Sequence, residues 1–193
     1  MRWASPNMWT AYLADCRRQH RAEGLTPLRV VRITVESHGL KALLGYRLGR
    51  HLSILAENGR QPLLRPLGWL LYWLISGYAR TALGIQLDLS ADIGPGLYIG
   101  HFGNIVLRRC RLGSHCSIAQ SVHIEPGVDG SGPILGDRVW VGAHARIVGG
   151  YLVGDRSTVS AGAVVRRDIP SGALFMGNPG RIVMIDYDNS SIL

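Results

Sequence analysis

The stretch ILGDRVWVGAHARIVGGYLVGDRSTVSAGAVVRRDI, residues 134–169, places an aliphatic residue at every sixth position. The same spacing begins near residue 87 and is interrupted twice, once by a single residue and once by five. The aliphatic positions are Leu87, Ile93, Ile99, Ile105, Leu112, Ile118, Ile124, Leu135, Val141, Ile147, Val153, Val159 and Val165. Neither an α-helix nor the two-residue alternation of a simple strand produces a six-residue period.

A six-residue period with small residues after the aliphatic ones is typical of a parallel β-helix. Each hexapeptide forms one short strand and one corner, so three make a coil of about eighteen residues with stacked aliphatic side chains. Glycine, alanine or serine after the aliphatic position permits a tight corner. We therefore predict a mainly β protein, with a left-handed parallel β-helix over residues 85–183 and a tail over 184–193.

The first 84 residues have a different pattern. Apolar and charged residues alternate at three- and four-residue intervals over residues 7–20, 28–54 and 63–83, with Gly24, Pro27 and Asn58 among the residues between these runs. This spacing favours helices, and the glycines and prolines favour breaks between them. We predict an N-terminal α-helical domain over residues 1–84.

Residues 66–79, PLGWLLYWLISGYA, form an apolar stretch between Arg65 and Arg80. Fourteen residues are too few to cross a bilayer core, which needs about twenty. Two interpretations are open. The segment is either a helix buried in an oligomer interface, or a helix lying in a membrane surface with its tryptophans, tyrosines and flanking arginines as interfacial anchors.

The composition restricts the partners and the compartment. A formal net charge of +8 suits anionic partners, but the arginines are scattered, and without a recognition motif we predict no nucleic-acid partner. The three cysteines lack paired metal-ligand spacing and no cleavable signal peptide is recognisable, so we expect a reducing cytoplasm and no metal. Cys110 and Cys116 are expected to be buried in the repeats.

A non-catalytic β-helix that only binds a partner is an alternative to an enzyme. Such a solenoid needs the repeat and nothing more. This chain also contains non-repeating insertions, a histidine beside a corner and a closing GNPGR segment at residues 177–181, which favour an enzyme.

Several segments resemble the serine acetyltransferase branch of the hexapeptide-repeat acyltransferases. They are GLKALLGYRLGRHL (39–52), ADIGPGLYIGHFGNIVL (91–107), SIAQSVHI (117–124), VGAHARIVGGYLVGD (141–155) and SAGAVVRRDIPSGALFMGNPGRIV (160–183). The resemblance implies acetyl-CoA as acyl donor and direct transfer to a hydroxyl. It also implies a homotrimer, with a helical half able to join two trimers.

The resemblance implies that His101 is the general base. An imidazole has a pKa near working pH, so it can take a proton from the acceptor hydroxyl and return it to the departing thiolate. His115 and His144 do not match the family position and are expected to be corner histidines that face solvent. The candidates for orienting the base or binding the acceptor are Gln86, Asp88, Asn104 and Gln120.

The resemblance also implies a donor groove along the β-helix, between neighbouring subunits. The acetyl-CoA contacts are expected at Gly142, Ala143, Ser160, Ala161, Gly177, Asn178, Pro179 and Arg181. Backbone groups beside small residues would line the groove, and the Arg181 guanidinium suits phosphate oxygens.

The chain departs from the family on the acceptor side. Gln86 and Gly100 stand where the family has aspartates, and the loop GVDGSGP (127–133) lacks the family's Arg-His pair. The family uses these positions to orient the base and hold the amino acid. We therefore expect a sugar hydroxyl of a cell-surface polysaccharide or its precursor as acceptor, with serine as the alternative. The expected location is the cytoplasm, with a peripheral position at the inner face of the membrane as the alternative if residues 66–79 form the interfacial helix.

Overall fold

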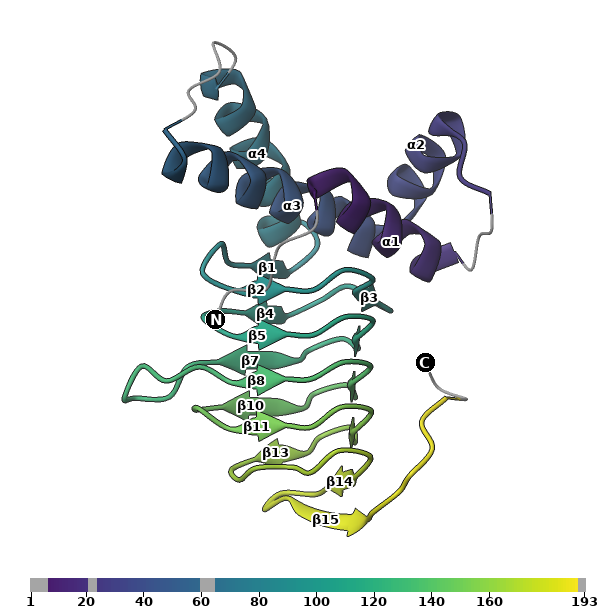
Figure 1. The fold of residues 1–193 in the computed structure, drawn as a ribbon, viewed down its shortest axis with the longest axis vertical. Coiled ribbons are helices and arrows are strands. Elements are labelled where there is room, and N and C mark those ends of the chain that lie inside the picture. Colours follow the sequence, from purple (N-terminus) through teal and green to yellow (C-terminus); the bar gives the residue numbers. More distant parts are fainter. Residues whose placement is uncertain (1–6, 21–23, 60–64, 191–193) are drawn as a thin grey trace.

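The computed structural model describes residues 7–20, 24–59 and 65–190, and places a helical region at one end of a β-helix (Figure 1). Within these ranges the helices are α1 (Met8–His20), α2 (Pro27–Glu36), α3 (His38–Glu57) and α4 (Arg65–Thr81). The start of the predicted run 63–83, and parts of the predicted domain 1–84 and tail 184–193, lie outside the described residues.

The predicted run 28–54 is wrong as a single helical segment, because Ser37 divides it. Ser37 has an extended backbone, with φ −95° and ψ 122°, and its hydroxyl accepts a hydrogen bond from the Leu40 amide. Serine is a favoured N-cap because its oxygen satisfies an amide that has no partner within the helix. The chain therefore ends α2 and starts α3 with a change of direction.

Helix α4 packs closely on α3 through glycines. A Cβ atom at Gly49 would lie 2.6 Å from the Tyr72 ring, and one at Gly45 would lie 2.9 Å from Cγ2 of Ile75. The opposite face of α4 has no neighbour within the described chain, and Ala79 is the buried residue of this helix. Within the described ranges, the helices are too short or too polar to cross a membrane.

The strands form three sheets, one along each side of the β-helix. The first sheet contains β1 (Ile85–Leu87), β4 (Ile105–Leu107), β7 (His123–Glu125), β10 (Arg146–Val148) and β13 (Val164–Val165). The second contains β2 (Asp92–Ile93), β5 (Arg111–Leu112), β8 (Ile134–Leu135) and β11 (Leu152–Val153). The third contains β3 (Tyr98–Ile99), β6 (Ser117–Ile118), β9 (Trp140–Val141), β12 (Thr158–Val159), β14 (Leu174–Met176) and β15 (Arg181–Met184).

The aliphatic residues of the repeat form the core, which confirms the predicted parallel β-helix. In the first sheet, Ile124 pairs with Ile147 and Ile147 with Val165, and all three are at most 1% exposed. The pairing is parallel throughout except at β15, which runs antiparallel to β14 with Arg181 opposite Met176. This antiparallel strand, which the repeat did not predict, covers the last coil.

The first interruption of the repeat lies elsewhere than the pattern indicated. Ile105 was expected to stack on Ile124. It is fully buried but pairs with Ile85, and Leu107 pairs with Ile124 instead. Because Ile99 pairs with Ile118, eight residue steps separate Ile99 from Leu107, against six in the next coil. Two extra residues therefore lie in the corner before β4, over residues 100–104, and one fewer follows β4.

The three cysteine thiols are buried in the core, as expected for the two in the repeats. Burial raises the pKa of Cys16 to about 11 and the pKa values of Cys110 and Cys116 to about 12. Because the thiolate is the reactive form, we expect no rapid reaction of the native protein with Ellman's reagent at pH 8. All three thiols should react after denaturation. A native thiol that reacts as fast as free cysteine would contradict this burial.

Candidate active site

Most of the predicted site residues lie along one corner of the β-helix, where the third sheet turns into the first. The register joins Ile99 to Ile118, Ile118 to Val141, Val141 to Val159, and Val159 to Phe175. The residues that follow these positions are therefore stacked in one column, coil upon coil. The column holds His101, Gln120, Gly142, Ala143, Ser160, Ala161 and Gly177.

His101 lies at the top of this column, in the enlarged corner 100–104. Backbone hydrogen bonds hold this corner from two sides. The Gly103 amide donates to the Leu83 carbonyl at 2.9 Å, and the Gly103 carbonyl accepts from the Ser121 amide at 2.9 Å. The His101 side chain is exposed in this corner. An accessible imidazole on a fixed backbone is suited to proton transfer with a bound substrate.

The helical region holds the start of this corner. Gly39, in the first turn of α3, has no Cβ, and one built there would lie 2.8 Å from Cβ of Ile99 and 2.9 Å from its carbonyl oxygen. The Gln19 side chain of α1 donates to the same carbonyl at 3.2 Å. Beyond His101, the Phe102 ring lies 4.7 Å from the His38 ring. The helices therefore position the corner, which the repeat alone did not reveal.

Replacing Gly39 with alanine is expected to lower kcat roughly tenfold or more, because the added methyl group must displace the Ile99 backbone and with it the corner. Steady-state kinetics and the unfolding midpoint measure the effect. Gly77→Ala in α4 is the matched control, since a Cβ there meets nothing within 4 Å. Equal kcat values for the two variants would contradict a positioning role for the α3 contact.

The lower part of the column has the close backbone packing expected of the donor side. A Cβ at Gly142 would lie 2.5 Å from the Ala161 amide nitrogen, and the Gly162 amide donates to the Ala143 carbonyl at 2.7 Å. The GNPGR segment continues from the last coil, with Gly177 at φ +94°. Asn178, Pro179 and Arg181 are exposed directly beyond the column.

The acceptor candidates are divided between two places. Gln120 lies one coil below His101, and Asn104 ends the His101 corner with φ +49°. Gln86 and Asp88 instead line a cavity of about 270 Å³ with Arg80, between α3, α4 and β1. Asp88 follows β1, whereas His101 precedes the parallel strand β4. Asp88 is therefore at the opposite end of the strands, where it accepts a hydrogen bond from the Ser90 amide at 2.8 Å.

The other histidines of the β-helix are placed differently. His115 and His144 have φ values of +57° and +62° and are corner residues. His123, which the sequence analysis did not consider, points outward from the first sheet with its Nδ1 3.4 Å from a carboxylate oxygen of Glu125. Its Nε2 is buried without a partner among the described residues. A histidine and a glutamate two positions apart share a strand face, and this spacing was the available signal.

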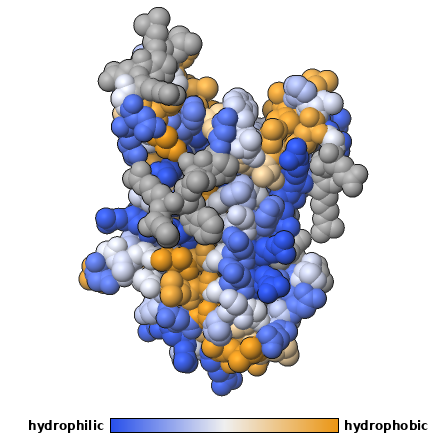
Figure 2. All heavy atoms as spheres, viewed as in Figure 1, coloured by the Kyte–Doolittle hydropathy of each residue, from blue (hydrophilic) through white to orange (hydrophobic). Residues whose placement is uncertain are grey.

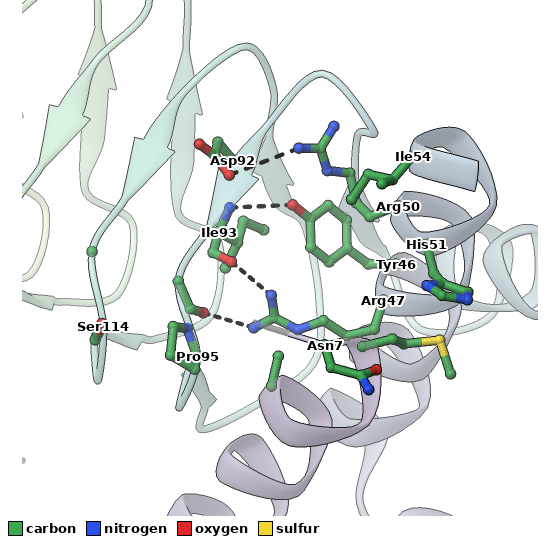
Figure 3. A pocket seen from close by; sticks show the side chains of 14 residues that line it. Asn7, Tyr46, Arg47, Arg50, His51, Ile54, Asp92, Ile93, Pro95 and Ser114 are labelled. Atoms are coloured by element: carbon green, nitrogen blue, oxygen red, sulfur yellow. Dashed lines mark hydrogen bonds and ion pairs between the residues drawn. The ribbon is translucent and has the colours of Figure 1, made fainter. Parts of the chain in front are cut away.

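A second cavity, of about 510 Å³, lies between α1, α3 and the first coils (Figure 3). None of the predicted site residues lines it. The Tyr46 hydroxyl donates to the Ala91 carbonyl at 2.9 Å and accepts from the Ile93 amide at 3.2 Å. Arg50 lies 3.8 Å from Asp92. These polar groups join the helices to the β-helix, so the cavity is part of a structural joint.

A buried ion pair completes this joint and was missed by the sequence analysis. The Asp15 carboxylate, fully buried, accepts from Nε and Nη2 of Arg47 at 3.0 and 3.1 Å, and from the Gly96 and Leu97 amides at 2.8 and 2.9 Å. Arg47 also donates to the carbonyls of Ile93 and Gly94, each at 2.6 Å. Asp15 and Arg47 therefore bind α1 and α3 to the corner after β2.

Comparison with known proteins places these features in a family. No family model matches the chain. A serine acetyltransferase of Helicobacter pylori is 32% identical over 157 residues, covering 77% of this chain and 82% of the relative. A serine acetyltransferase of Synechococcus elongatus is 33% identical over 114 residues, and the chain spans 47% of that relative's length.

Solved structures agree. A soybean serine acetyltransferase complexed with serine has a TM-score of 0.69 at 27% identity, covering 93% of this chain and 71% of that one. A serine acetyltransferase in complex with CoA has a TM-score of 0.72 at 25% identity, covering 92% and 70%. Because the Helicobacter relative is 32% identical and covered over 82% of its length, the chain belongs to the serine acetyltransferase family, a family of acyltransferases.

Proposed function

We propose that the chain is an acetyl-CoA-dependent O-acetyltransferase with His101 as general base. The column that begins at His101 and ends at the GNPGR segment carries the proposal. Its five coils are spaced about 4.8 Å apart, so the column is roughly 19 Å long. This length suits an extended pantetheine arm with its thioester at His101 and its phosphates near Arg181. The relative in complex with CoA supports the donor.

The transfer is direct in this proposal. The imidazole of His101 accepts the hydroxyl proton of the acceptor as its oxygen attacks the thioester carbon. The carbon–sulfur bond breaks, the acetyl group stays on the acceptor oxygen, and the imidazolium returns the proton to the thiolate of CoA. The proton and the acetyl group are thus both accounted for, and the chain itself forms no covalent intermediate.

Serine is the acceptor that the relatives support, including the soybean enzyme complexed with serine. A sugar hydroxyl is the second candidate, because three places where the family resemblance implies charged acceptor-binding residues lack them here. Gln86 and Gly100 are uncharged, and the loop 127–133 has no arginine or histidine. An amino acid brings an ammonium and a carboxylate that lose hydration on binding, and each needs an opposite charge.

Release of free CoA thiol from acetyl-CoA, measured with serine and then with a panel of sugars, tests the function. Turnover with serine at a higher rate than with any sugar supports serine, and the reverse order supports the sugar. Calorimetric titration with CoA measures the donor side separately. Absence of both thiol release and CoA binding would refute the enzyme and favour a non-catalytic β-helix.

A homotrimer remains part of the proposal, since the donor groove of the family lies between neighbouring β-helices. Sedimentation equilibrium with and without CoA measures the subunit number. A monomer that binds CoA with full affinity would contradict a groove between subunits.

A further inference from the structure

Helix α4 has an outer face made of apolar side chains. Opposite its contact with α3, six large apolar residues are 48% to 67% exposed: Leu67, Leu70, Leu71, Trp73, Leu74 and Tyr78. Five of them follow the three- and four-residue spacing that places side chains on one side of a helix. In the view of Figure 2, apolar side chains are visible on both helical arms, next to hydrophilic ones. A face of this kind is an expected interaction surface.

We propose that the outer face of α4 binds the surface of an anionic lipid bilayer. The helix Arg65–Thr81 contains no aspartate or glutamate, it has an arginine near each end, and the chain carries a net charge of +8. Trp73 and Tyr78 are residues that lie well at the boundary between headgroups and acyl chains. A bilayer provides the apolar layer for the leucines and the phosphates for Arg65 and Arg80.

A two-fold contact with a second copy of the chain fits this face less well. In a two-fold symmetric contact between two antiparallel α4 helices, Arg65 of one copy lies near Arg80 of the other. Because α4 has no acidic residue, these like charges have no partner within the contact. An anionic membrane removes this repulsion, which is why we favour it.

Helix α2 provides a matched control. It exposes Leu28, Val31 and Val35, at 81%, 60% and 64%, but it has no aromatic residue. It also contains Glu36, whose carboxylate is 2.9 Å from Nε of Arg32. The α2 face is therefore apolar without the anchors and the uniform positive charge of α4.

Vesicle sedimentation of the full chain tests the proposal. The wild type should bind vesicles containing phosphatidylglycerol more tightly than vesicles of phosphatidylcholine alone, and salt should reduce the difference. The variant Leu70→Gln, Trp73→Gln, Leu74→Gln should bind at least about tenfold more weakly. The control Leu28→Gln, Val31→Gln, Val35→Gln should bind as the wild type does. Trp73→Gln alone should show the same direction of change if the triple variant does not fold.

The proposal is overturned if the wild type binds neither kind of vesicle, or if the α2 control loses as much binding as the α4 variant. Light scattering identifies the competing occupant. A wild type that ignores vesicles, together with an α4 variant of lower molecular mass, would show that a second copy covers the face. Matching circular dichroism and unfolding midpoints establish that the compared variants are folded.

Discussion

Replacing His101 with alanine is expected to lower the rate of acetyl transfer by about 10²- to 10⁴-fold, the usual contribution of a general base. The imidazole is the group at the top of the column that can accept the hydroxyl proton. Because its side chain is exposed and outside the core, the unfolding midpoint should not change. Thiol release from acetyl-CoA gives the rate, and thermal unfolding gives the stability.

His115→Ala is the matched control for this experiment, since His115 is also an exposed corner histidine of the β-helix. It lies outside the column and should leave turnover near the wild-type value. CoA affinity should survive in both variants, because the proposed donor contacts lie lower in the column. Near-normal turnover of His101→Ala would end its assignment as the base.

Replacing Asp15 with alanine is expected to reduce the free energy of unfolding by about 3–5 kcal/mol, because Arg47 would then be a buried charge without its partner. The Gly96 and Leu97 amides would also lose their acceptor. Chemical denaturation followed by circular dichroism measures the change. Asp15→Asn should reduce the free energy of unfolding by less, since the amide oxygen of asparagine can still accept hydrogen bonds.

Glu36→Gln provides the control, because it removes an ion pair that is exposed to solvent. Exposed ion pairs contribute little to the free energy of unfolding, so the unfolding transition of Glu36→Gln should coincide with that of the wild type. If Asp15→Ala reduced the free energy of unfolding by no more than Glu36→Gln does, the packing of the helices on the β-helix would not depend on the buried ion pair.

The sequence by itself determined the β-helix. A core position that must be aliphatic in every coil repeats along the chain, so the six-residue period is visible without any structure. The same reasoning located the helices, because helical packing also repeats at fixed intervals. The periodicity did not reveal the break at Ser37, where one helix ends and the next begins. A cap is a single residue, so it leaves the surrounding period unchanged.

The candidate site was predicted in part. His101 and the small residues of the donor side were found by resemblance, and the register then placed them in one column. The acceptor side could not be predicted, because Gln86 and Asp88 line a cavity whose other walls come from α3 and α4, and the six-residue period does not show which helices pack against β1.

Only the tertiary structure showed where the extra residues of the first coil lie. The sequence shows that the period slips by one residue, but the strand pairing shows that two are added before β4 and one is lost after it. Asp15 and Arg47 likewise have no periodic signature, since each pairs once and across 32 positions of sequence. Repeated contacts leave a pattern in a sequence, whereas single long-range contacts become visible only when the chain has folded.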